Sequence, residues 1–306
     1  MGPPMPIHIH LLALTTALAW GSGAILNKKG FSMGGNPVQS SVIVVGVNVL
    51  IFWIFFWMWN GLDDALAHIS WSTIGLFALA GLFGNALGRF LALYGIDQLG
   101  VTINTAGIST RPLFAATIAV IWLGERLQPF LLIGILLVVI GIITLVFSKG
   151  GNLQGWKAWQ IWISLGAGAS FAIGNVIRRF GLTTTPTTPL EGLTIDQTAA
   201  FVGLLIYAYA QKNINVFSAP PKTYLFFTGA GILGAIGHFC LFEALDRGPV
   251  AIVDPLIATQ PLFATFLAYF LLGDLERVTP KLVIGTLLIV LGASIVMLYD
   301  PSTILE

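Results

Sequence analysis

The segments TRPLFA at residues 110–115 and TQPLFA at residues 259–264 differ in one letter and lie 149 positions apart. The similarity extends over residues 76–124 and 225–273, and the matched pairs include Gly88 with Gly237, Phe90 with Phe239, Asp97 with Asp246 and Pro112 with Pro261. Two extra residues then shift the offset to 151, at which the first apolar segment also matches the sixth. A fixed period indicates an internal duplication. We therefore interpret the chain as two copies of one unit.

The composition is that of a membrane protein. Of the 306 residues, 56% are hydrophobic and 9% are charged, whereas soluble domains have roughly 45–50% apolar and about 25% charged residues. The net charge of +1 argues against a nucleic-acid partner, which requires a clustered basic surface. Cys240 is the only cysteine, so no intrachain disulfide can form.

Apolar runs of membrane-spanning length recur along the chain, since about 20 helical residues cross a hydrocarbon core of roughly 30 Å. We expect ten spans, at residues 9–27, 38–59, 71–95, 101–123, 129–147, 157–178, 193–211, 223–245, 250–272 and 281–299. The start of the chain lacks a basic region, so it is interpreted as a retained first span. The predicted fold class is an all-α membrane protein with a first five-helix repeat over residues 1–150 and a second over residues 151–306.

An odd number of spans in each repeat has a topological consequence. The second copy enters the membrane from the opposite side, so the two copies form an inverted repeat. Inverted repeats of secondary transporters enclose a binding site near the midplane of the bilayer. This pattern predicts a carrier that works by alternating access around a central cavity.

Several motifs are similar to those of a known family. They are AWGSGAILNKK near the end of the first helix, P-L-F-A in both halves, W-L-G-E after the first of these, and Gly-six residues-Gly closing each half. The chain resembles the EamA family of the drug/metabolite transporter superfamily. The resemblance implies an exporter or exchanger of small metabolites, amino acids among them, with cytoplasmic termini and no use of ATP. The second helix departs from the pattern, because VQSSVIVVG stands where many members carry Arg-Phe.

Pro112 and Pro261 lie near the centres of the fourth and ninth predicted spans. Because proline lacks an N–H, each leaves a carbonyl one turn earlier without a partner, at Ile108 and Ile257. Inside a bilayer such a carbonyl must face protein or a water-filled cavity. We expect two kinked helices that line the cavity and serve as hinges, while a role in packing alone is the alternative.

Arg111 precedes Pro112 and therefore lies at mid-membrane, where an arginine costs about 2.5–3.5 kcal/mol on insertion scales. We expect it to face the interior and to bind an anion. Its counterpart in the second half is the neutral Gln260. The alternative is a permanent ion pair with Glu243 or Asp254.

Further candidates come from the remaining polar residues of the apolar segments. Arg89 corresponds to His238, and Asn85 shares a helix face with Arg89. His238 is either a proton-coupling group or a neutral packing residue. Tyr94 corresponds to Glu243, which is also spaced for an ion pair with Arg247. The predicted solute-binding residues are Arg111, Gln260, Arg89, Asn85, His238, Trp20, Tyr94, Lys28, Asn175 and Glu243.

Two of these residues have ordinary alternatives. Lys28 stands where the resembled family often carries a lysine, yet an interfacial lysine that extends toward water would look the same. Trp20 could stack against a solute or simply pack.

The residue types indicate the class of solute. Cations in a low-dielectric cavity favour carboxylate or phosphate groups, and the neighbouring aromatic residues suit an amphipathic molecule. An amino acid or a related carboxylate is therefore predicted, with phosphorylated or nucleotide-type metabolites, or a passive channel, as alternatives. The chain lacks the GxxxxGK[ST], HExxH and GxSxG motifs, so we predict no enzyme activity, cofactor or metal.

The expected partners are a small-molecule solute and the lipid bilayer, in the cell membrane, and both a monomer and a homodimer remain open. More Lys and Arg residues follow the odd-numbered spans than the even-numbered spans. The positive-inside rule then places the N-terminus outside, whereas the family resemblance implies the reverse, so the orientation is left open.

Overall fold

The computed structural model describes residues 7–60, 69–114, 117–118, 129–148, 150–152, 155–210, 216–248, 250–273 and 275–297. The first half contains α1 (Ile7–Ser32), α2 (Pro37–Asn60), α3 (Trp71–Gly81), the π-helical segment η1 (Leu82–Gly88), α4 (Arg89–Leu99), α5 (Val101–Ile108) and α7 (Pro129–Val146). The second half contains the short 3₁₀ helix η2 (Ala158–Gln160), α8 (Ile161–Thr184), α9 (Pro189–Ala210), α10 (Pro221–Arg247), α11 (Val250–Ile257), α12 (Gln260–Leu271) and α13 (Pro280–Met297). Two short strands, β1 (Gly151–Asn152) and β2 (Glu276–Arg277), pair antiparallel.

Local sequence sets the ends of these helices. Proline opens α2, α7, α9, α10 and α13, where its missing N–H would have no helical partner in any case. The Ser70 side chain caps α3 by accepting a hydrogen bond of 3.1 Å from the Thr73 backbone N–H. Gly100 separates α4 from α5 with φ of 88°, a left-handed conformation that glycine adopts without strain.

Six helical stretches within the described residues are long and apolar enough to cross a membrane: 8–32, 37–59, 71–99, 158–184, 189–210 and 221–247. Large apolar side chains such as Leu50, Trp59 and Phe266 are exposed, while Asn48, Asp196 and Thr102 are fully buried. A surface that is apolar outside and polar within suits a chain surrounded by lipid. The end of the fourth predicted span, residues 119–123, lies outside the described residues.

The fourth and ninth predicted spans are interrupted rather than kinked. Helix α5 ends at Ile108 and α11 ends at Ile257, and turns follow at residues 109–110 and 258–259. Pro261 then lies in the first turn of α12, where a proline disturbs no hydrogen bond. The turns match in detail, because Thr110 Oγ1 donates to Gly107 O at 2.8 Å and Thr259 Oγ1 donates to Leu256 O at 2.6 Å. The expectation of continuous kinked helices was therefore wrong.

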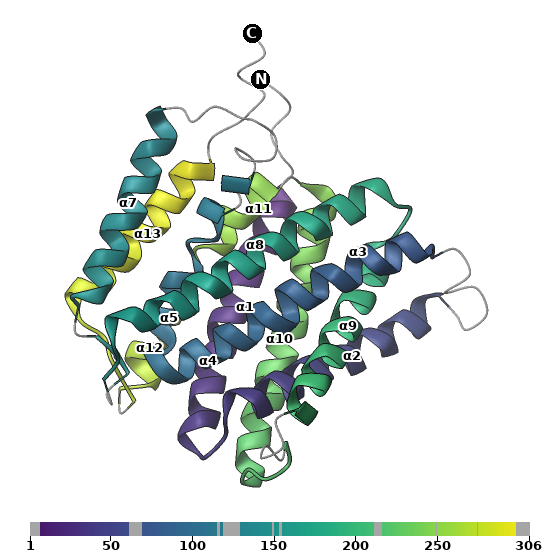
Figure 1. Cartoon of the computed structure of the whole chain (residues 1–306), viewed down its shortest axis with the longest axis horizontal. Helices are drawn as coiled ribbons and strands as arrows, with labels where there is room; N and C mark the ends of the chain where they lie inside the picture. The colour runs from purple at the N-terminus through teal and green to yellow at the C-terminus, as the bar shows by residue number, and fades with distance from the viewer. Residues whose placement is uncertain are drawn as a thin grey trace.

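Matched helices of the two halves pack in opposite directions. Helices α7 and α13 lie side by side at one edge of the molecule (Figure 1). A Cβ added at Gly141 would lie 2.9 Å from Gly285 O, and one added at Gly292 would lie 2.6 Å from Gly134 O. The contact is therefore antiparallel and reciprocal, and it requires glycine on both sides.

The remaining helix contacts show the same reciprocal relationship between the two halves. Helix α1 packs mainly against α10, and its counterpart α8 packs against α3, η1 and α4, the counterparts of α10. Helices α2 and α9 lie beside one another (Figure 1), with Asn48 Nδ2 donating to Gln197 Oε1 at 3.1 Å. An approximate two-fold rotation that exchanges the two halves accounts for all of these contacts.

Candidate functional site

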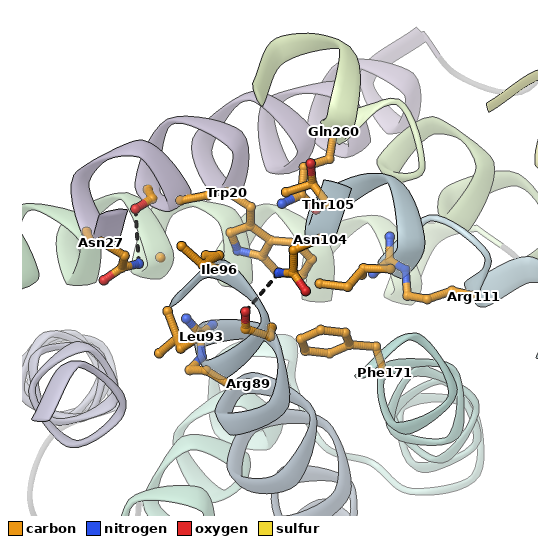
Figure 2. Close-up of a pocket in the computed structure, with 16 residues that line it drawn as sticks. Trp20, Asn27, Arg89, Leu93, Ile96, Asn104, Thr105, Arg111, Phe171 and Gln260 are labelled. Atoms are coloured by element: carbon orange, nitrogen blue, oxygen red, sulfur yellow. Dashed lines mark hydrogen bonds between the residues drawn. The ribbon is translucent and has the colours of Figure 1, made fainter. Parts of the chain in front are cut away.

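A polar cavity of about 70 Å³ lies between the two halves. It is lined by Trp20, Gly23, Ala24, Asn27, Arg89, Ala92, Leu93, Ile96, Asn104, Thr105, Ile108, Arg111, Phe171, Ala230, Gly234 and Gln260 (Figure 2). These residues come from α1, α4, α5, the segment after α5, α8, α10 and α12. The volume is enough for a few water molecules and is well below the roughly 300–1,000 Å³ of sites for drug-sized ligands.

Equivalent residues of the two halves meet at this cavity. Trp20 and Phe171 correspond at the offset of 151, and their rings stack with centroids 6.4 Å apart. Arg111 and Gln260 correspond at the offset of 149, and both line the cavity. The cavity therefore lies on the approximate two-fold axis, and its two sides differ in charge.

The two arginines that line the cavity, Arg89 and Arg111, each have an unpaired hydrogen-bond donor. Within the part of the chain that the structure describes, Nε of Arg89 and Nε of Arg111 are buried and have no hydrogen-bond partner. Arg111 is 1% exposed and lies 6.0 Å from the ring centroid of Trp20 and 5.9 Å from that of Phe171. Such positions over aromatic rings stabilise a cation without using its hydrogen bonds.

Asn104 supplies the matching acceptor. Its Nδ2 donates to Ala92 O at 2.8 Å, as drawn in Figure 2. Its Oδ1 has no partner among the described residues. Buried polar atoms are nearly always paired, so a cavity whose lining residues include an unpaired acceptor and unpaired donors indicates a place for a polar ligand.

A buried polar network adjoins the cavity. Nε of Arg178 pairs with Oδ2 of Asp196 at 2.9 Å, and its Nη1 donates to Asn175 Oδ1 at 2.7 Å. Asn175 in turn donates to Asp254 Oδ1 at 2.8 Å. Asn85 joins the other end, since its Nδ2 donates to Asp196 and its Oδ1 lies 2.8 Å from Nε2 of His238.

The sequence-predicted site residues fall into three groups. Trp20, Arg89, Arg111 and Gln260 line the cavity. Asn85, His238 and Asn175 belong to the adjoining network. Lys28, Tyr94 and Glu243 lie elsewhere in the structure. The buried prolines, Pro112 and Pro261, are not among the lining residues either.

Each residue of the third group has a different environment. Lys28 is buried at the end of α1, where its Nζ donates to Ile96 O at 3.3 Å. Tyr94 is 39% exposed and stacks on Phe90. Glu243 is held by Arg247 four residues later. The fixed ion pair considered for Arg111 is absent from the described residues, because Asp254 acts on Arg111 electrostatically without a salt bridge.

Sequence reasoning missed five polar or aromatic residues of this region: Asn27, Asn104, Phe171, Arg178 and Asp196. Arg178 and Asp196 were detectable as charges within apolar segments, and an intramembrane charge is a functional candidate by default. Phe171 was detectable as the counterpart of Trp20 at the offset of 151. Asn104 gave no signal, because nothing in the sequence shows that its acceptor is left unpaired.

Apolar helices of membrane-spanning length, arranged as two matched halves around a cavity that buried polar side chains line, are the architecture of a membrane transporter. A model of the EamA-like transporter family matches this chain twice, over residues 8–147 and 158–298. The chain belongs to this family, and it is a multi-pass membrane transporter of small solutes.

One curated relative agrees with that assignment, and one solved structure shares the fold. The chain is 24% identical over 219 residues to YvbV of Bacillus subtilis (strain 168), an uncharacterized transporter, and the match covers 69% of this chain and 70% of that protein. A solved crystal structure of a protein at 17% sequence identity superimposes with a TM-score of 0.67, covering 95% of this chain and 97% of the other. This second likeness concerns the fold alone.

Proposed function

We propose that this protein is a secondary carrier of the cell membrane for small carboxylate-bearing solutes, amino acids or related metabolites, acting as an exporter or exchanger. The observation that carries the proposal is the pair of cavity arginines, Arg89 and Arg111, each with a buried Nε that lacks a partner. A guanidinium presents a planar set of donors that fits a carboxylate. A carboxylate bound between them would satisfy both.

The charges of the described core support an anionic solute. The central charged groups are three guanidiniums, Arg89, Arg111 and Arg178, and two carboxylates, Asp196 and Asp254. Arg178 is neutralised by its salt bridge with Asp196. One positive charge is therefore in excess at the cavity. Because an uncompensated charge is costly away from water, a solute anion would stabilise the loaded carrier.

Size and polarity narrow the class further. A volume of about 70 Å³ favours small solutes over nucleotide-type metabolites. The unpaired Oδ1 of Asn104 suits a solute with a hydrogen-bond donor beside its carboxylate. Trp20 and Phe171 offer apolar faces for a side chain. These features together fit an amino acid better than a phosphorylated metabolite.

Two matched contacts support alternating access. Lys28 Nζ donates to Ile96 O, and Nη1 of Arg179 donates to Leu245 O. Arg179 corresponds to Lys28 at the offset of 151, and Leu245 corresponds to Ile96 at the offset of 149. Because the halves are related by an approximate two-fold rotation, these contacts belong to opposite ends of the path, and we assign them as the two gates.

The surroundings of the two gates differ. Glu276 is the strongest opposite charge acting on Lys28, and it accepts a hydrogen bond of 3.2 Å from the Thr102 N–H at the start of α5. Burial raises the pKa of the Glu276 carboxyl, and its backbone hydrogen bonds and Lys28 oppose this rise. At the other gate, Nη1 of Arg179 donates to the backbone carbonyls of Leu245 and Asp246 near the end of α10.

Packing also differs between the two ends. Ala92, Leu93 and Ile96 line the cavity, whereas their counterparts Leu241, Phe242 and Leu245 do not. The cavity therefore occupies one of two symmetry-equivalent volumes and not the other. In the alternating-access cycle that we propose, the cavity-lining arrangement of one repeat and the closed arrangement of the other are exchanged. The two repeats are residues 1–150 and 151–306, which together cross the membrane ten times.

Reconstituted liposomes test the proposal. Purified protein is reconstituted and assayed with a labelled panel of the standard amino acids, pyruvate, lactate and 2-oxoglutarate. Saturable uptake, accelerated by unlabelled substrate on the opposite side, is expected for at least one carboxylate. Transport restricted to permanent organic cations would refute the proposed class of solute, and a flux that neither saturates nor shows counterflow would indicate a channel.

A further inference from the structure

A chain of hydrogen bonds connects His238 to Asp196 through Asn85. The donors and acceptors in this chain determine how many protons it contains. Nδ1 of His238 lies 2.7 Å from Gly234 O, and its Nε2 lies 2.8 Å from Asn85 Oδ1. The Nδ2 of Asn85 donates to Oδ1 of Asp196. Both residues at the ends of the chain are almost completely buried, with His238 1% and Asp196 0% exposed.

Gly234 O is a carbonyl and only accepts, so Nδ1 of His238 must carry a proton. The carboxylate of Asp196 also only accepts, because Arg178 holds it as an anion, and this fixes the Asn85 amide with its Nδ2 toward Asp196. Asn85 Oδ1 then faces Nε2 of His238, and two acceptors cannot form a hydrogen bond. The pattern is satisfied only when Nε2 also carries a proton, which makes His238 an imidazolium.

The same conclusion holds if the Asn85 amide is turned over. Its Nδ2 then donates to a neutral His238, but its Oδ1 faces Asp196, which must be protonated to donate. Both arrangements contain one proton more than a neutral histidine with an ionised aspartate. We propose that His238, Asn85 and Asp196 form a proton-binding site, and that its proton is coupled to the solute bound at Arg89.

Arg89 connects this site to the cavity. Its Nη2 lies 3.2 Å from Nε2 and 3.5 Å from Nδ1 of His238, and it lines the cavity. A guanidinium nearly equidistant from both ring nitrogens cannot donate in the ring plane to each of them. Its positive charge lies against the ring and opposes an imidazolium. A solute carboxylate at Arg89 would neutralise that charge and so favour protonation.

No other described group around His238 links its protonation to the bound solute in this way. The Trp20 ring lies 5.0 Å from the imidazole, centroid to centroid, and carries no charge. Arg178 on α8 is the second cation that acts on His238, but it is paired with Asp196. On α10 itself Glu243 is paired with Arg247, and on α11 Asp254 acts on Arg111. Arg89 is therefore the group through which a bound solute changes the protonation of His238.

The charge balance of the transport step is consistent with this coupling. With the extra proton released, so that His238 is neutral and Asp196 is ionised, the core carries three arginines and two aspartates, a net charge of +1. An anion that enters together with one proton leaves this net charge unchanged, so loaded and empty carriers have the same buried charge. The proton binds to the His238 imidazole or the Asp196 carboxylate. It dissociates from that group when the carrier opens to the opposite side of the membrane. No redox partner is needed.

Calorimetry tests the coupling, which rests on the proposed function. A carboxylate from the panel that binds is titrated into wild-type protein at one pH in buffers of different ionisation enthalpy. We expect uptake of up to about one proton per bound solute and, by linkage, an affinity that rises up to about tenfold for each unit of decreasing pH. His238→Gln should bind the same carboxylate without proton uptake, whereas His10→Gln, a histidine on α1 outside the cavity, should behave as wild type.

A second measurement reads the proton directly. The chain has four histidines, and a His8→Gln, His10→Gln, His68→Gln variant leaves His238 alone. When the carboxylate binds, the ¹⁵N resonances should show that Nε2 of His238 has gained a proton, so that both ring nitrogens carry one. Alternatively, the ¹³C carboxyl shift of Asp196 should show that this residue has gained the proton. Binding without such a change, or uptake that persists in His238→Gln, overturns the coupling and leaves carboxylate transport standing. If no carboxylate in the panel binds, the proposed function itself fails.

Discussion

Arg89 and His238 occupy equivalent positions in the two halves of the chain, 149 residues apart, and their side chains lie 3.2 Å apart in the structure. Equivalent residues touch only where a symmetry axis passes between them. The duplication therefore brings a permanent cation and a titratable ring together at the centre of the protein. One sequence position, once duplicated, has diverged into two chemical roles.

Removing either cavity guanidinium should weaken solute binding. Arg89→Gln and Arg111→Gln each delete charge-assisted hydrogen bonds, which contribute about 1.5–3 kcal/mol. We expect the affinity for a carboxylate to fall roughly 10- to 150-fold, measured as Kd or as half-saturation of uptake. Arg247→Gln removes an exposed cation outside the cavity and should change little. Equal losses in all three variants would contradict a specific anion site.

Breaking the buried pair of Arg178 and Asp196 should destabilise the fold. Arg178→Met leaves the Asp196 carboxylate buried without its partner, which costs about 3–5 kcal/mol. Thermal unfolding in detergent should show a large decrease in Tm. The double variant Arg178→Met with Asp196→Leu should recover part of the loss, because no uncompensated charge remains. A double variant less stable than the single one would argue against this account.

The two gate contacts should control access from opposite sides. In a Cys240→Ser background, a cysteine placed at the cavity residue Ala24 is labelled from either side of liposomes with an impermeant maleimide. Lys28→Gln should increase labelling from the side where α1 ends, and Arg179→Gln from the other side. An increase on the same side for both variants would show that the contacts do not belong to opposite ends.

The glycine contact between α7 and α13 should tolerate no side chain. Gly141→Leu forces atoms into the backbone of α13, and overpacking of this kind costs typically about 1–3 kcal/mol. Gly75→Ala is the control, because a Cβ there meets nothing within 4 Å and alanine favours the helix. We expect a lower Tm for the first variant and an unchanged or higher Tm for the second. Unchanged stability of Gly141→Leu would mean that the two helices separate without cost.

Much of the architecture follows from the sequence alone. The hydropathy places the chain in a membrane, and the offsets of 149 and 151 reveal the duplication, which the two family matches confirm. The period also pairs Arg111 with Gln260 and Arg89 with His238. These inferences succeed because apolar length and repetition are properties of the chain itself and need no knowledge of packing.

Other features depend on how distant segments meet. The sequence could not show that Arg178 pairs with Asp196, that Lys28 and Tyr94 lie away from the cavity, or that the proline-containing spans are broken at Ile108 and Ile257. A helix pattern gives the face of a residue but not its neighbour across the fold. Whether a buried charge is paired, and which of two equivalent volumes holds the cavity, is decided by tertiary packing, because desolvation and contact depend on every element around the group.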